Sequence, residues 1–306
     1  MKSSEKPTTK ISHSRVYSFG LIGYPLGHSY SPIIHQSALK ALDLRGQYLL
    51  YPVEPTSKAN EQLQDLLNRI RSNEIGGLNV TIPHKQRVIP FLNKLTTTAE
   101  AVGAVNTIYL EDGRLIGDNT DAGGFWVDLQ KILITAEKDE NQKALVLGAG
   151  GSALAVVYSL IKNEFQVKIA SRRIEQSIEL CEQFEIYQEY LSYCALANEF
   201  SISGDYSLIV NATPVGMHPQ KGKSPWPKDM PFPSGCVVYD LVYNPQKTRL
   251  IKQAEGAGIP CSSGLGMLVE QAALSFEKWT KMEAPRNAIY TTIANEINGN
   301  TREDHF

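Results

Sequence analysis

Apolar and polar residues alternate over a short segment near position 80. The sequence of residues 77–85 is GLNVTIPHK, where Leu78, Val80 and Ile82 alternate with Asn79 and Thr81. This period of two predicts a strand with one apolar face and one polar face. The proline at position 83 cannot donate to a sheet ladder, so we expect the strand to end there. The segment would thus place two polar side chains on one face and a lysine, Lys85, just past the strand end.

Strand-like and helix-like patterns alternate through the first 120 residues. Apolar runs predict strands over residues 16–22, 48–53, 104–110 and 115–116. A helix is expected to begin at Ser31-Pro32, with the serine as N-cap and the proline in the first turn, and a leucine-rich helix is expected over 59–71. Asp112-Gly113 predicts a hairpin turn. This alternation favours a mainly parallel sheet covered by helices.

A second strand–helix–strand pattern begins after a polar stretch at residues 133–143, which we interpret as a helix end and linker. Residues 144–148 form an apolar strand pattern, a helical pattern covers 153–161, and another strand is predicted at 166–170. Later strands are predicted near 207–211 and 236–241, with a proline-rich surface loop from 214 to 233. The chain therefore divides into two α/β units.

A glycine-rich turn joins the first strand and helix of the second unit. Gly148, Ala149, Gly150, Gly151, Ser152 and Ala153 match G-x-G-x-x-[GA] in the strand–turn–helix context that this motif requires. Small residues let the backbone approach a pyrophosphate, and free amides at the helix start point toward it. A glycine turn without a ligand is the alternative interpretation.

The end of the following strand indicates which dinucleotide is bound. NAD enzymes usually place an acidic residue there, but this chain has Ser171, Arg172 and Arg173. Two guanidinium groups suit the 2′-phosphate of NADP(H), with charge-assisted bidentate hydrogen bonds. The nearby Glu175 would weaken that preference, and two solvated arginines are the other interpretation.

Composition and charge narrow the classes of function. A chain of 306 residues is long for one domain, and 42% hydrophobic residues can bury a sizeable core. A net charge of −2 gives no reason to expect nucleic acid or a membrane surface as partner. The four cysteines lack metal-ligand spacing, so we expect reduced thiols, no metal and a cytoplasmic location. Residues 1–14 are polar, lack the apolar run of a signal peptide and are expected to form a disordered tail.

Candidate substrate groups gather in short polar segments with apolar flanks, at 27–32, 103–107, 117–121 and 264–271. Lys85 and Asp121 are the candidate acid/base pair, since a lysine can be tuned for proton transfer near neutral pH. Taken singly, each residue has an ordinary interpretation: Lys85 as a surface lysine, Ser31 as an N-cap, and Asn106 and Asp121 as loop residues.

Eight ordered motifs resemble the shikimate dehydrogenase family from about Tyr17 to Trp279. They are GYPLGHSYSPIIH (23–35), GLNVTIPHK (77–85), AVGAVNT (101–107), GDNTDAGGF (117–125), GAGGSA (148–153), NATPVGM (211–217), DLVYNP (240–245) and GLGMLVEQAA (264–273). The resemblance implies reversible, NADPH-dependent reduction of 3-dehydroshikimate to shikimate, a step toward chorismate and the aromatic amino acids. The implied partner is a small molecule, with the chain acting as a monomer or a homodimer.

The resemblance also assigns roles to individual residues. Lys85 and Asp121 would be catalytic and would flank the reacting C3 oxygen and its neighbour at C4. The implied substrate ligands are Ser29, Ser31, Thr81, Lys85, Asn106, Asp121, Tyr243 and Gln271. Besides the glycine turn and Ser171–Arg173, the implied cofactor residues are Thr213, Met217, Gly264 and Met267. We expect a structural role for His28, His35 and His84.

The implied fold has two α/β domains with the active site in the cleft between them. Residues 15–121 and 265–306 would form the substrate domain, with a mainly parallel sheet, and residues 122–264 the NADP-binding Rossmann domain. A dual quinate/shikimate dehydrogenase using NAD would predict an acidic residue at the ribose position. A non-catalytic sensor of the same fold would predict loss of Lys85 or Asp121, and both are present.

Overall fold

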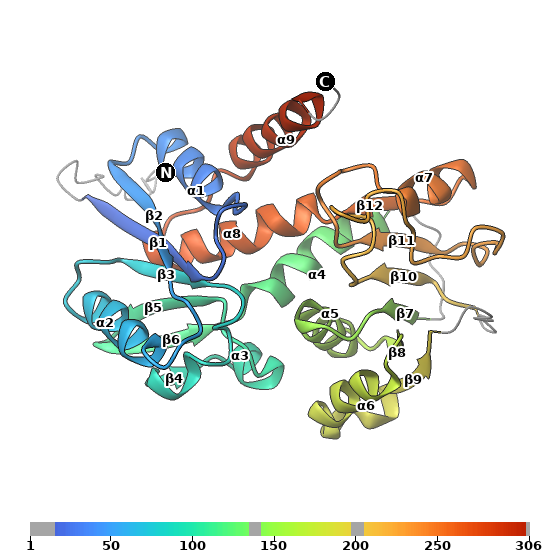
Figure 1. The fold of residues 1–306 in the computed structure, drawn as a ribbon, viewed down its shortest axis with the longest axis horizontal. Helices are drawn as coiled ribbons and strands as arrows, with labels where there is room; N and C mark the ends of the chain where they lie inside the picture. Colours follow the sequence, from blue (N-terminus) through green and yellow to red (C-terminus); the bar gives the residue numbers. More distant parts are fainter. Residues whose placement is uncertain (1–15, 135–141, 197–204, 304–306) are drawn as a thin grey trace, which may run out of the picture.

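Two six-stranded sheets make up the described part of the chain in this computed structural model, which covers residues 16–134, 142–196 and 205–303. Figure 1 shows the sheets in separate halves, with helices α4 (Thr120–Leu133) and α8 (Leu265–Thr280) running from one half to the other. The predicted class, two α/β domains with a Rossmann-like second sheet, is confirmed. The predicted domain boundaries fall within the first turn of α4, at 121/122, and at the start of α8, at 264/265, and they stay a prediction.

The first sheet is mixed, with three parallel strand pairs and two antiparallel ones. Its order is β2-β1-β3-β5-β6-β4, and its strands are β1 (Tyr17–Gly23), β2 (Gly46–Pro52), β3 (Gly77–Val80), β4 (Lys94–Leu95), β5 (Thr107–Glu111) and β6 (Arg114–Asp118). The pairs β1–β2, β1–β3 and β4–β6 are parallel, whereas β3–β5 and β5–β6 are antiparallel. The β5–β6 pair is the predicted hairpin, where Asp112 and Gly113 both adopt positive φ, whereas the antiparallel β3–β5 pair was not predicted.

Helices cover this sheet on both faces. Helices α1 (Ser31–Ala41), α8 and α9 (Arg286–Glu303) contribute to one core around Phe19, and α2 (Ala59–Arg71) and α3 (Thr97–Val102) contribute to another around Leu78. A short 3-10 helix lies at Ile89–Phe91. Because β3 is covered on both sides, all four of its residues are buried.

Two details of the sequence prediction are wrong. The strand near position 80 ends at Val80 instead of continuing to Ile82, and the Ile82 side chain is 71% exposed. The pairing of β3 with β1 ends at Val80 and its pairing with β5 at Asn79, so Ile82 lies beyond the sheet. Ser31 is the first residue of α1 rather than its cap, which is Tyr30, and the main-chain amide of Ser31 donates to Ser29 Oγ at 3.3 Å. The Ser31 hydroxyl therefore forms no side-chain cap.

The second sheet is parallel throughout, in the order β12-β11-β10-β7-β8-β9. Its strands are β7 (Lys143–Leu147), β8 (Gln166–Ser171), β9 (Leu191–Ala195), β10 (Leu208–Asn211), β11 (Val237–Asp240) and β12 (Cys261–Ser263). Helices α5 (Gly151–Lys162), α6 (Ile174–Gln183) and α7 (Arg249–Gly256) and a 3-10 helix (Glu185–Tyr190) complete this half. The strand order reverses at β7, so the cleft at the carboxyl ends of β7 and β10 is where such sheets bind ligands.

Helices α4 and α8 pack closely because glycines remove side chains at their contact. A Cβ at Gly124 would lie 2.6 Å from the main-chain nitrogen of Gln271, and one at Gly266 would lie 2.0 Å from Asp128 Oδ1. The Asp128 carboxylate accepts a hydrogen bond from Tyr239 of β11 at 2.6 Å. The two helices therefore form a close connection between the two sheets.

Several predictions fall outside the described residues. The tail at 1–14 does, as does most of the proposed linker at 133–143. Within the described residues, no helix combines the length and apolar character needed to cross a membrane, and no cluster of His, Cys, Asp and Glu side chains could hold a metal ion. The four cysteines are free, and burial raises the pKa of Cys181 and of Cys236 to about 11.

Candidate functional site

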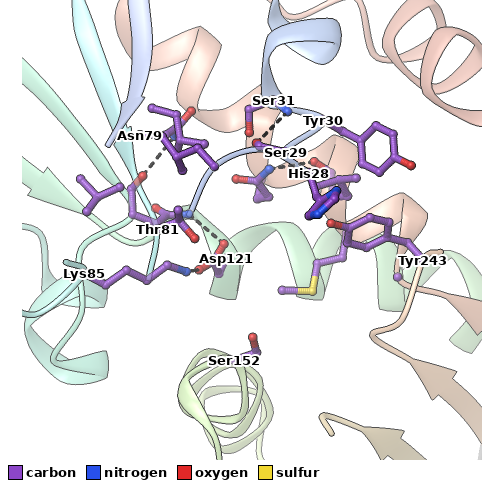
Figure 2. A pocket seen from close by; sticks show the side chains of 18 of the residues that line it. His28, Ser29, Tyr30, Ser31, Asn79, Thr81, Lys85, Asp121, Ser152 and Tyr243 are labelled. Carbon is purple, nitrogen blue, oxygen red and sulfur yellow. Dashed lines mark hydrogen bonds and ion pairs between the residues drawn. The ribbon is translucent and has the colours of Figure 1, made fainter. Parts of the chain in front are cut away.

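A cavity of about 420 Å³ lies between the two halves of the molecule. It is lined by all eight side chains predicted as substrate ligands, namely Ser29, Ser31, Thr81, Lys85, Asn106, Asp121, Tyr243 and Gln271. These residues come from loops after β1, β3 and β11, from the residue before β5, and from helices α1, α4 and α8. Figure 2 shows the serines on one wall, Lys85 and Asp121 on another, and Ser152 of α5 across the opening. The fold thus gathers residues from four distant parts of the chain.

Lys85 and Asp121 form an ion pair at the edge of this cavity. Lys85 Nζ lies 2.6 Å from Asp121 Oδ2, with 27% and 16% of the two side chains exposed. Asn106 Nδ2 donates to the other carboxylate oxygen at 2.8 Å. Asp121 is in the first turn of α4, where the helix dipole favours a negative charge. Lys85 and Asn106 therefore hold the two oxygens of the Asp121 carboxylate, and Lys85 lines the cavity.

The turn that carries Lys85 is anchored to the sheet on both sides of the lysine. His84 is fully buried, and its Nε2 donates to the main-chain oxygen of Val53 at 2.6 Å. The main-chain oxygen of Lys85 accepts from the amide of Val105 at 2.8 Å. These contacts agree with the structural role expected for His84. His35 is also buried, stacked on Tyr48, and burial lowers its pKa to about 3, so it is neutral at ordinary pH.

Hydroxyl groups cluster at the end of the cavity opposite Lys85. Ser29 and Ser31 lie at the start of α1, and Tyr243 approaches from the loop after β11. Burial raises the pKa of Tyr243, with a further contribution from Tyr30, so the phenol stays protonated and can donate to an anion. Three neutral donors in one place suit a carboxylate.

Tyr30 and Asn79 line the cavity but were not among the predicted site residues. The Tyr30 ring packs edge-on against Tyr243, with centroids 6.1 Å apart, and its hydroxyl accepts a hydrogen bond from Asn244 Nδ2 at 3.0 Å. Asn244 belongs to the second half of the molecule, so this contact crosses the cleft. Tyr30 stands between Ser29 and Ser31 in the sequence, and this position could have identified it as a site residue. Asn79 lies on the polar face predicted for the strand.

The glycine turn leaves open space in front of helix α5. Gly148 adopts φ +103°, and a Cβ there would lie 2.8 Å from the side chain of Thr213. A Cβ at Gly150 or Gly151 would meet nothing within 4 Å. The amides at the start of α5 are thus accessible, and Ser152 reaches the cavity. This shape fits a pyrophosphate.

The remaining predicted cofactor residues lie at the end of β8, after β10 and β12, and in α8. Arg172 and Arg173 are exposed directly after β8, while Ser171 is buried and donates to the main-chain oxygen of Arg173 at 2.5 Å. Gly264 and Met267 line the cavity, and Met217 is 44% exposed. Of the predicted cofactor set, only Ser152, Gly264 and Met267 line the cavity itself.

Buried hydrogen bonds hold the loop that carries Thr213. Asn211 Oδ1 accepts from the Thr213 amide at 3.0 Å and from its hydroxyl at 2.6 Å. Asn211 Nδ2 donates to Asp240 at 2.8 Å, and Asp240 also accepts from the amide of Val242, next to Tyr243. The Thr213 loop and the Tyr243 loop are therefore tied to one carboxylate, that of Asp240.

Comparison with known proteins gives a consistent result. A model described as the shikimate dehydrogenase substrate binding domain matches residues 21–108, and one described as the shikimate 5'-dehydrogenase C-terminal domain matches residues 264–293. The shikimate dehydrogenase (NADP(+)) of Salinibacter ruber is 41% identical over 278 residues, covering 89% of this chain and 95% of the relative.

Solved structures agree with this assignment. Shikimate 5-dehydrogenase from Thermus thermophilus, in complex with NADP(H) and shikimate, is 33% identical with a TM-score of 0.75 and covers 90% of this chain and 98% of its own. Quinate dehydrogenase from Corynebacterium glutamicum, in complex with NAD, is 27% identical with a TM-score of 0.82 and covers 91% and 99%. The resemblance inferred from the motifs is confirmed, and the chain belongs to the shikimate dehydrogenase family.

Proposed function

We propose that this chain catalyses the NADP-dependent interconversion of 3-dehydroshikimate and shikimate. The observation that carries the proposal is the Lys85–Asp121 pair, which meets neutral hydroxyl and amide groups in a single cavity beside the open start of α5. The relatives' names supply the reaction and the cofactor. The cavity offers donors for a carboxylate at one end and an acid/base pair at the other, as a polyol carboxylate requires.

The substrate carboxylate would bind to Ser29, Ser31 and Tyr243. Each of these groups is a neutral donor, so together they bind the anion without adding a competing positive charge near the reacting end. Thr81, Asn106 and Gln271 would hydrogen-bond the ring hydroxyls, because amides and hydroxyls can both donate and accept. These contacts fix the ring so that its C3 oxygen faces Lys85.

Lys85 and Asp121 would manage the proton. During reduction the C3 carbonyl oxygen gains negative charge, and the Lys85 ammonium can stabilise that oxygen or donate a proton to it. The Asp121 carboxylate holds the ammonium at 2.6 Å and lies beside the C4 hydroxyl in the proposed pose. In the reverse direction, Lys85 would take the proton from the C3 hydroxyl.

NADP(H) would bind along the second sheet, and when bound it supplies the two-electron redox chemistry. The open space at Gly150 and Gly151 fits the pyrophosphate, and the exposed guanidinium groups of Arg172 and Arg173 fit the 2′-phosphate. Thr213, Met217, Gly264 and Met267 would surround the nicotinamide end. We propose these roles for the predicted cofactor residues.

Initial rates with shikimate and with quinate, each with NADP⁺ and with NAD⁺, test the proposal. We expect the highest kcat/KM for shikimate with NADP⁺. A preference for quinate with NAD⁺ would favour the dual quinate/shikimate enzyme instead. Absence of turnover in all four combinations would contradict the proposal and favour a sensor.

A further inference from the structure

Behind the ion pair, a cluster of buried polar groups connects the cavity to helix α8. It consists of the side chains of Asn79, Asn106, Thr107, Thr120 and Ser275, with exposures of 6%, 3%, 0%, 2% and 0%. Ser275 comes from α8, whereas its partners come from β3, β5 and the start of α4, at least 155 residues earlier in the chain. The predicted substrate ligand Asn106 is the member that touches Asp121.

Ser275 lies where these elements meet. Its Oγ is 2.7 Å from Thr107 Oγ1, 3.1 Å from Thr120 Oγ1 and 3.0 Å from Asn79 Nδ2. The hydroxyl also reaches the main-chain oxygen of Gln271, one turn earlier, at 3.0 Å. Ser275 has one proton to donate, and its shortest contact, with Thr107 Oγ1, favours donation to Thr107, so Ser275 accepts from the other members of the cluster.

The two amides of the cluster have fixed orientations. Asn106 Oδ1 accepts from the main-chain amide of Thr120 at 2.8 Å, so its Nδ2 must face Asp121. Asn79 Nδ2 faces the main-chain oxygen of Asn106 at 3.1 Å, and its Oδ1 accepts from the hydroxyl of Tyr48 at 2.8 Å. Neither amide can be reversed without placing two donors or two acceptors together.

One arrangement of the hydroxyl protons satisfies every group. Ser275 donates to Thr107, Thr107 donates to Asn106 Oδ1 at 3.0 Å, and Thr120 accepts from Asn106 Nδ2 at 2.9 Å. Thr120 then donates to Ser275. Without the Ser275 hydroxyl, the Thr120 proton would have to turn to Thr107, at 3.3 Å, or compete for Asn106 Oδ1, at 3.2 Å. Either change disturbs the amide that supports Asp121.

We propose that Ser275 is a positioning residue for the reaction, acting through Thr120 and Asn106 on the Asp121–Lys85 pair. Helix α8 would therefore contribute to catalysis as well as connecting the two halves. Because the cluster is buried, water does not readily replace the lost acceptor, and a hydrogen-bonding group left without a partner is destabilising. This inference rests on the proposed function and adds a residue to it.

Ser275→Ala tests the proposal in shikimate oxidation with NADP⁺, compared with the wild type and with Ser37→Ala. Ser37 is a matched control, since its hydroxyl also contacts a main-chain oxygen of its own helix, that of Ile34 at 2.7 Å, but it lies outside the site. We expect Ser275→Ala to reduce kcat about tenfold, the loss expected for one hydrogen bond that aligns the reacting groups. The KM for NADP⁺ should change less than about twofold, as should both parameters in Ser37→Ala.

A double-mutant cycle with Asn106→Ala separates positioning from a general loss of structure. If Ser275 acts through Asn106, Ser275→Ala should lower kcat less than about twofold in the Asn106→Ala background. The same tenfold loss in both backgrounds, or a kcat for Ser275→Ala near that of the wild type, overturns the inference. If Ser275→Ala does not fold, Ser275→Cys, with a weakly hydrogen-bonding thiol of similar size, enters the same cycle.

The wild-type rate distinguishes failure of this inference from failure of the proposed function. An active wild type with an unaffected Ser275→Ala contradicts this inference and leaves the proposed function standing. A wild type without turnover contradicts the proposed function, and this inference with it.

Discussion

Two adjacent glycines of helix α4, Gly123 and Gly124, differ in the space available for a Cβ, so alanine at each position can be compared directly. A Cβ at Gly124 would lie 2.6 Å from the main-chain nitrogen of Gln271 and 2.9 Å from its Cα. A Cβ at Gly123 would approach only Leu274 Cδ1, the end of a flexible side chain, at 3.0 Å. We therefore expect Gly124→Ala to push α8 away from α4 and Gly123→Ala to be accommodated.

The magnitudes follow from two opposing effects. Replacing glycine by alanine inside a helix gains about 1 kcal/mol in helix propensity, and this gain is shared by both variants. Overlap with a packed backbone costs about 1–3 kcal/mol, and it applies only to Gly124→Ala. The propensity terms cancel in the comparison, so the two variants should differ in stability by about 1–3 kcal/mol.

Thermal unfolding of the two variants measures this difference. In chains of roughly 150–250 residues each kcal/mol shifts Tm by about 2–4 °C, so Gly124→Ala should melt several degrees below Gly123→Ala. Because Gln271 is a proposed substrate ligand, Gly124→Ala should also raise the KM for shikimate more than the KM for NADP⁺. A Tm for Gly124→Ala at or above that of Gly123→Ala would refute the reasoning.

Two further predictions concern charged groups. Arg172→Ala should raise the KM for NADP⁺ at least about tenfold and leave the KM for NAD⁺ nearly unchanged, because the lost guanidinium would bind only the 2′-phosphate. Equal effects on the KM of both cofactors would contradict this role. The control is Arg114→Ala, which removes an exposed arginine of the other half and should change neither KM. Burial alone raises the pKa of Glu270, but hydrogen bonds from Lys131 and Arg286 lower it overall from 4.5. The stability that this carboxylate contributes is thus present above about pH 4.5 and is lost as the pH falls through its lowered folded-state pKa. Glu270→Gln should lower the free energy of unfolding by about 1–3 kcal/mol at pH 7, and its difference from the wild type should narrow below pH 4.5. The control is Glu255→Gln, which removes an exposed ion pair with Lys247 and should change the stability little. A difference between Glu270→Gln and the wild type that does not depend on pH would contradict the lowered pKa of Glu270.

Local pattern was enough to predict most of the framework. The helix over Ala59–Arg71 and the hairpin at Asp112-Gly113 are found as expected, because amphipathic periodicity and turn chemistry are local properties. The exposed Ile82 and the antiparallel β3–β5 pair were not predicted. Both depend on which strands pair and how far, and sequence spacing alone does not determine this.

The site was predictable where short motifs carry the chemistry. All eight predicted substrate ligands line one cavity, although their binding roles remain predictions. Ser275 could not be found in this way, because a serine in an apolar helix has no local signal. Its importance arises only when α8 packs against Thr107 and Thr120, and the same holds for Tyr30, whose partner Asn244 lies 214 residues later.

The most direct test of the account is the turnover of Lys85→Ala, measured together with shikimate binding. If Lys85 handles the proton at the C3 oxygen, the variant should lose at least about 100-fold in kcat, while calorimetry still detects shikimate binding. Near-normal turnover in Lys85→Ala would contradict the central claim that the Lys85–Asp121 pair performs the acid/base chemistry.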